Sequence, residues 1–112
     1  MVIVSLFDAF LLETAKEVLE RICGGDATKY ILQYVIMKNM KWGATALKYG
    51  DDPKLFADPL SAIIGPASSP VEDLIVKKMH VKLGMEFRDN DWEFSDYIRY
   101  LKGVYYDKKK NN

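Results

Sequence analysis

The chain has one cysteine, one histidine and no net charge among its 112 residues. With Cys23 alone, no disulfide can form within the chain, which favours a reducing, cytoplasmic setting. One histidine and one cysteine cannot complete a zinc site of nitrogen and sulfur ligands. At helical spacing His80 shares a face with Lys77 and Asp73, which predicts a histidine at the protein surface.

The charge balance and the lack of long apolar runs argue against two further kinds of partner, nucleic acids and membranes. Sixteen basic and sixteen acidic residues cancel, with seven of each in residues 1–56 and nine of each in residues 57–112. A nucleic-acid binder usually has a clear basic excess, so this balance argues against nucleic acid as a partner. No apolar run approaches the length of a membrane-spanning helix, and the apolar first four residues lack the basic segment of a signal peptide. We therefore expect no membrane partner.

Signatures of catalysis are also lacking. The sequence has no glycine-rich phosphate loop, no G-x-S-x-G and no H-E-x-x-H. The segment Asp89-Asn90-Asp91 resembles the start of a calcium loop, but Phe94 stands at the position of the turn glycine and Tyr100 at that of the bidentate glutamate. We expect no enzyme, no catalytic residue, no cofactor and no metal.

Helix-capping residues and apolar residues at helical spacing are abundant. The clearest case is the helix Ser69–Leu83, where Ser69 can cap the N-terminus, Pro70 fits the first turn and Glu72 can reach back to the cap. Gly84 provides the left-handed residue that ends it. Its apolar residues recur at helical spacing: Leu74, Ile75, Met79 and Leu83.

The first half of the chain predicts two more helices. One opens near Ser5, with Asp8 as capping-box partner, and ends at Gly24-Gly25. Asp26 can cap the next, over residues 27–37. Because residues 30–37 are almost all apolar, we expect this helix to be central in the fold or covered by a second subunit.

Two further helices complete the prediction. Asp52-Pro53 opens one that ends at Gly65, and Pro59 inside it predicts a kink or a break. The last opens near Asn90 and carries an apolar stripe from Phe94 to Tyr105. The chain is thus predicted to be all-α, a compact bundle of five to six helices, with one domain over residues 1–107 and a disordered basic tail over residues 108–112.

Two interaction surfaces can be predicted. The last helix carries more tyrosines than one core can bury, which favours a homodimer with an interface at Tyr97, Tyr100, Tyr105 and Tyr106. The alternative is a sequence-specific DNA-binding regulator that uses the Ser69–Leu83 helix, with DNA contacts from Lys77, Lys78 and Lys82.

A family resemblance runs from Tyr30 to Leu101. It rests on four segments: Asp52-Pro53 with Phe56, Ile63-Ile64-Gly65, residues 72–78 with Leu83-Gly84, and residues 94–98. In this order they resemble the Nitrososphaera output domain, a small all-helical archaeal family, although Pro59 and the turn over residues 66–70 depart from its pattern. The resemblance implies a role downstream of a sensor and implies no catalytic residue. We therefore predict a non-enzymatic protein-interaction or signal-output module.

Overall fold

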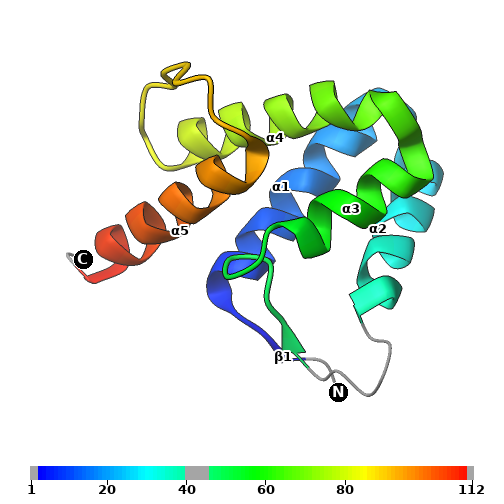
Figure 1. Cartoon of the computed structure of the whole chain (residues 1–112), viewed down its shortest axis with the longest axis horizontal. Helices are drawn as coiled ribbons and strands as arrows, with labels where there is room; N and C mark the ends of the chain where they lie inside the picture. The colour runs from blue at the N-terminus through cyan, green and yellow to red at the C-terminus, as the bar shows by residue number, and fades with distance from the viewer. Residues whose placement is uncertain (1–2, 40–45, 111–112) are drawn as a thin grey trace.

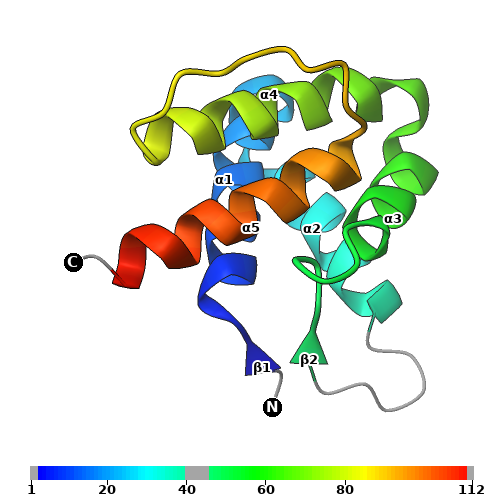
Figure 2. The same ribbon diagram turned by 60° about the vertical axis from the view of Figure 1, so that its left-hand side comes forward.

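The structure is a computed structural model that describes residues 3–39 and 46–110 (Figure 1). The helices are α1(Leu6–Cys23), α2(Gly25–Asn39), α3(Lys54–Ile64), α4(Ser68–Lys82) and α5(Phe94–Lys110). A 3-10 turn, η2(Gly65–Ala67), joins α3 to α4, and the two-residue strands β1(Ile3–Val4) and β2(Ala46–Leu47) pair in parallel (Figure 2). The predicted all-helical fold is confirmed. The predicted five to six helices compare with five α-helices and the 3-10 turn η2 among the described residues, and the short strand pair was not foreseen.

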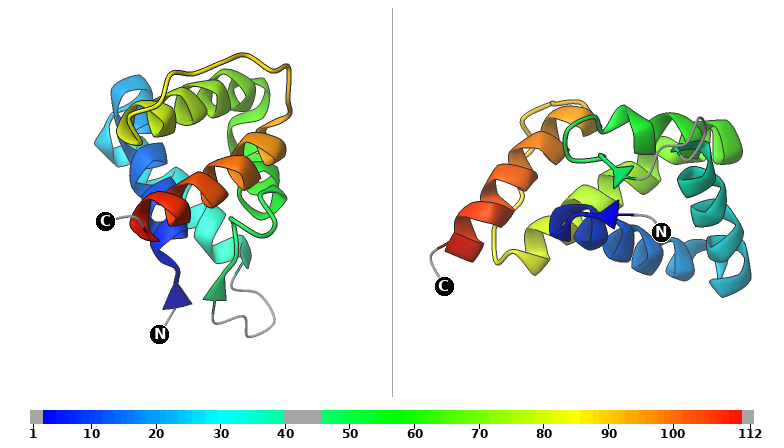
Figure 3. Two further views of the ribbon diagram at one scale, coloured as in Figure 1. Left: turned by 90° about the vertical axis from the view of Figure 1, so that its left-hand side faces the viewer. Right: turned by 90° about the horizontal axis from the view of Figure 1, so that it is seen from below.

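Helix α1 lies at the centre of the fold. It contacts α2, α4 and α5, and in the view from below it lies between α5 and α2 (Figure 3, right). Residues 27–37 do not form the central helix within this chain, because Tyr30 is 72% exposed and Met37 is 68% exposed. The alternative, that a second subunit covers this helix, stays a prediction. When residues on all sides of a helix are apolar, the sequence does not predict which face packs against the core. In the structure only one face of α2 is buried, against α1 and α3. The largest fully buried side chains include Phe7, Leu11, Leu19, Tyr49, Phe56, Leu60, Ile75, Met79, Ile98 and Leu101.

Helix ends follow the predicted glycines. Gly24, Gly65 and Gly84 all have positive φ and directly follow α1, α3 and the last turn of α4, as expected for residues that end helices. After α4, the N–H of Gly84 donates to Val81 O at 3.0 Å and that of Met85 to His80 O at 2.9 Å. This bonding pattern is a Schellman motif, which terminates α4 as the sequence predicts.

Helix starts follow the predicted caps less well. Ser5 is confirmed, since its Oγ accepts the Asp8 N–H at 3.1 Å. Ser69 is not a cap, because α4 already begins at Ser68, where η2 supplies the preceding turn. Asp26 lies within α2, and Asn90 lies four residues before α5 begins at Phe94. The prediction of a disordered tail over residues 108–112 was wrong for Lys108, Lys109 and Lys110, which form the last turn of α5, while Asn111 and Asn112 lie outside the described residues.

Pro59 lies inside α3 without splitting it. A proline has no N–H, so the carbonyl of Leu55 loses its partner one turn earlier in the helix. The side-chain amide of Asn39 replaces that partner, with Nδ2 3.1 Å from Leu55 O. The same Nδ2 lies 2.9 Å from the hydroxyl of Tyr49 and 2.9 Å from Val35 O. One asparagine therefore links α2, α3 and the segment before α3.

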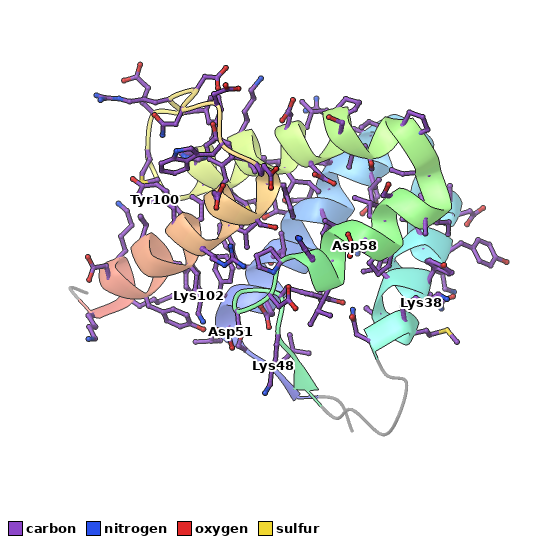
Figure 4. All side chains as sticks on the ribbon, viewed as in Figure 1. Lys38, Lys48, Asp51, Asp58, Tyr100 and Lys102 are labelled. Atoms are coloured by element: carbon purple, nitrogen blue, oxygen red, sulfur yellow. The ribbon has the colours of Figure 1, made fainter. Side chains whose placement is uncertain are left out.

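The turn before α3 is fastened to both ends of the chain. The N–H of Gly50 donates to the buried Asp8 carboxylate at 2.9 Å, and Lys102 on α5 forms an ion pair with Asp51 (Figure 4). Burial raises the pKa of Asp8, although its bonds from Gly50 and Ser5 oppose the shift. Lys102 lowers the pKa of Asp51 by hydrogen bonding and by its charge. The turn thus holds α1 and α5 together.

Between α4 and α5, residues 84–93 form a loop that arches along α4 (Figure 2). The N–H of Asp91 donates to Asp89 Oδ1 at 2.9 Å, and the N–H of Asn90 donates to the hydroxyl of Tyr97 at 3.0 Å. Phe87 is half-buried against the core. Among the described helices, none is long and apolar enough to cross a membrane.

Candidate functional site

An apolar groove separates the C-terminal half of α1 from α4. It encloses about 350 Å³ and has a mostly apolar lining. Ile22, Leu74 and Val81 are 53%, 45% and 74% exposed there, although all three are large aliphatic residues. The remaining lining residues are Val18 and three cations, Arg21, Lys77 and Lys78. We call this surface the α1/α4 groove.

The cations of the groove form no ion pair, although the charge of Lys78 acts on Glu17 and Lys77 Nζ lies 5.5 Å from the ring centroid of Phe87. In the described part of the chain, no carboxylate lies within 4.0 Å of the charged groups of Arg21, Lys77 or Lys78. The lining itself contains no acidic residue. The α1/α4 groove is therefore an apolar channel with a positively charged rim in a protein of zero net charge.

The predicted DNA-contacting lysines differ in their contacts. Lys82 forms an ion pair with Glu17, donates to Thr14 Oγ1 at 3.2 Å and lies 5.7 Å from the ring centroid of Phe10. Its charge is thus used within the monomer, and it lowers the pKa of Glu17 through hydrogen bonding. Lys77 and Lys78 lie instead on the rim of the groove. DNA contact by the three lysines stays a prediction.

The four predicted interface tyrosines differ in their surroundings. Tyr97 is 6% exposed, and its hydroxyl accepts a loop N–H. Tyr105 stacks on Phe10 at 5.2 Å, and the hydroxyl of Tyr106 accepts the N–H of Phe7 at 3.3 Å. Tyr100, on the side of α5 that faces the loop and α4, is 47% exposed (Figure 4). The homodimer interface stays a prediction, and Tyr100 is the member with the most free surface.

His80 is not the surface residue that its helical face predicts. It is 4% exposed, because the loop over residues 84–93 folds back across that face of α4. Phe87 packs edge-on against its ring at 5.2 Å, and Tyr97 does so at 6.5 Å. The apolar Phe87 within this loop is the sequence feature that could have predicted the burial of His80. His80 also lines a second cavity, of about 380 Å³, between the loop and α5.

A third cavity, of about 360 Å³, collects acidic residues where α3, α4 and the start of α5 meet. Its carboxylates are Asp58, Glu72, Asp73 and Glu93, with Lys54 the one cation of the lining. Glu72 makes no capping bond with the residues described here, in contrast to the capping box that the sequence predicts. Burial, followed by repulsion from Asp73 and Asp58, raises the pKa of Glu72 from 4.5 to about 7. We call this cavity the acidic notch.

Replacing Glu72 by glutamine should stabilise the chain at about pH 8 and leave it unchanged at about pH 4. The folded chain binds the proton of the Glu72 carboxyl group more tightly than the unfolded chain does. The contribution of this group to the free energy of unfolding is therefore fully present below pH 4.5 and is lost as the pH rises through about 7. Because the side chain is only half-buried, solvent screening limits the gain to about 1 kcal/mol. Thermal denaturation at both pH values measures it.

The control for this variant is Glu13→Gln, which removes one negative charge from the exposed face of α1. An equal effect of the two substitutions, or an effect of Glu72→Gln that is the same at both pH values, would show that the acidic notch does not disfavour the Glu72 carboxylate.

No family model, curated protein or solved structure matches the chain. The resemblance to the Nitrososphaera output domains therefore stays a prediction. Among the described residues, no three histidine, cysteine, aspartate or glutamate side chains gather as metal ligands would. The α1/α4 groove is the feature with an open apolar surface and a charged rim of one sign. Sequence reasoning missed Arg21, Ile22 and Val81 as its members, because the crossing of α1 and α4 brings them together.

Proposed function

We propose that this chain is a non-enzymatic protein-interaction module and that the α1/α4 groove is its docking site. The observation that carries this function is the meeting of three exposed aliphatic side chains with three unpaired cations in one channel. Exposed apolar surface with a polar rim is the usual composition of a docking site on a soluble domain. A role in signal output, which the family resemblance implies, is part of the same proposal.

The occupant that fits is an amphipathic helix with acidic flanks. Two helices form the channel and offer no free strand edge, so the matching mode is a helix that lays apolar residues into the groove. Its acidic residues would meet the rim of Arg21, Lys77 and Lys78. A second copy docked face to face would bring the two basic rims together, which like-charge repulsion disfavours.

A fluorescein-labelled synthetic helix tests this function. The probe is a peptide of about 15 residues with leucine and phenylalanine at i, i+3, i+4 and i+7 and with glutamate and aspartate elsewhere. We expect a dissociation constant on the order of 10 µM by fluorescence anisotropy, because the groove is short. Binding should weaken as salt is raised. Amide shifts in an ¹H–¹⁵N spectrum should map to facing residues of α1 and α4.

Two variants and one control locate the site. Leu74→Ser and Lys77→Glu should each weaken binding at least about fivefold. Tyr30→Ser removes an even more exposed apolar residue from α2, 72% exposed against 45% for Leu74, and should change nothing. A scrambled peptide of the same composition should bind more weakly. Equal binding of a lysine-for-glutamate peptide would contradict the proposal, as would displacement of the acidic peptide by a DNA duplex, which would favour the DNA-binding alternative.

A further inference from the structure

The cavity beneath the loop has the composition of a small-molecule site. Its volume of about 380 Å³ lies within the range of ligand pockets. Trp92, Tyr97 and Tyr100 form its aromatic part. Trp92 is 42% exposed and Tyr100 is 47% exposed, and their ring centroids lie 5.7 Å apart. Two large aromatic side chains are thus left partly open to solvent at one cavity, which we call the aromatic pocket.

His80 brings a buried, directional polar group to the same cavity. Its Nδ1 lies 2.8 Å from the Val76 carbonyl oxygen, which can only accept, so Nδ1 carries the hydrogen. In the neutral ring Nε2 is then an acceptor. No residue of the described chain donates a hydrogen bond to Nε2. Nε2 is also not fully buried, so it can be reached from outside the protein. His80 is one of the residues that line the aromatic pocket, and the residue as a whole is 4% exposed.

The pocket also holds a cation without an ion-pair partner. Arg88 belongs to the lining, and no carboxylate of the described residues lies within 4.0 Å of its guanidinium. Glu86 lines the pocket too, so a ligand of either charge has a partner to meet. An arginine can bind a carboxylate or phosphate through two parallel hydrogen bonds, which a lone glutamate cannot offer a cation. The arginine therefore decides the expected charge of the ligand.

We propose that the aromatic pocket binds a planar heteroaromatic acid, which donates a ring N–H to Nε2 of His80 and presents its anionic group to Arg88. The planar ring packs against Trp92 and Tyr100. An N–H donor satisfies the open acceptor of a side chain that is otherwise buried. This site is separate from the α1/α4 groove, which shares no lining residue with it.

Three related probes test the proposal on the unaltered chain. Indole-3-acetate has the planar ring, the N–H and the carboxylate. Its 1-methyl derivative has a methyl group in place of the N–H hydrogen, and tryptamine replaces the acid by an ammonium group. By calorimetry we expect indole-3-acetate to bind and the other two to bind at least about tenfold more weakly. The imidazole ¹⁵N resonances of His80 should shift with indole-3-acetate, because Nε2 gains a donor.

Two substitutions separate the roles of the residues. His80→Phe keeps a buried aromatic ring and removes Nε2, and it should weaken indole-3-acetate to the level of the 1-methyl probe. Arg88→Gln should reduce the preference for the acid over tryptamine. Equal binding of indole-3-acetate and its 1-methyl derivative would overturn the proposal, as would no binding of indole-3-acetate at all. Since that comparison uses the unaltered chain, it holds even where His80→Phe fails to fold.

Discussion

Replacing Gly50 by alanine should lower the free energy of unfolding by about 2 kcal/mol. A Cβ atom at this position would lie 2.9 Å from Lys102 Cδ and 3.0 Å from Phe7 Cδ2. Neither neighbour can move away freely, because Lys102 is held by its ion pair with Asp51 and Phe7 is fully buried. A shift of the turn itself would lengthen the bond from the Gly50 N–H to Asp8. Urea denaturation of the two proteins measures the loss.

The matched control is Gly103→Ala. Gly103 lies inside α5, and a Cβ there would meet nothing within 4 Å. Alanine is the better helix former, so this substitution should raise stability by about 0.5–1 kcal/mol. The same change of residue is therefore expected to have opposite signs at the two positions. A neutral or stabilising Gly50→Ala would mean that the turn does not pack against Phe7 as the structure has it.

The sequence predicts the ends of helices better than their starts, for a physical reason. A glycine ends a helix because its own backbone can adopt a positive φ, which does not depend on distant residues. Gly24, Gly65 and Gly84 all have a positive φ. A cap depends on the chain before it. Ser69 has the right neighbours for a cap, but η2 supplies a preceding turn and makes the cap unnecessary.

The sequence predicts which residues are buried where a helix has a single apolar stripe. It does not predict burial where contacts with a distant part of the chain cover a residue. The stripes of the first and last helices face the core, with Phe7, Leu11, Ile98 and Leu101 all fully buried. His80 has polar helical neighbours, and only the return of the loop across α4 covers it.

The candidate sites depend on such tertiary contacts even more. The α1/α4 groove needs the crossing of two helices that lie about fifty residues apart. Its lysines, Lys77 and Lys78, were predicted to face a partner, but the third, Lys82, is held by α1. No spacing rule within one helix shows which of three neighbouring lysines will find a carboxylate on another helix.

Replacing Asn39 by leucine should cost about 2 kcal/mol of stability, although leucine is a good helix former. The amide Nδ2 lies 2.9 Å from the Tyr49 hydroxyl and 3.1 Å from Leu55 O. Tyr49 is fully buried, and burial raises its pKa to about 12 even though the bond from Asn39 opposes the shift. Leucine would leave both oxygens without this donor. Gln33→Leu, an exposed amide on the same helix, should cost much less.

The role of Pro59 makes this prediction sharper. Leu55 O needs Asn39 because Pro59 has no N–H to offer it. Pro59→Ala restores a backbone donor to that carbonyl, so Asn39→Leu should cost less in the Pro59→Ala background than in the original chain. A double-mutant cycle by urea denaturation gives the coupling, which we expect at about 1 kcal/mol. Strict additivity of the two substitutions would show that Asn39 acts through Tyr49 and Val35 alone, and that α3 tolerates Pro59 without help from α2.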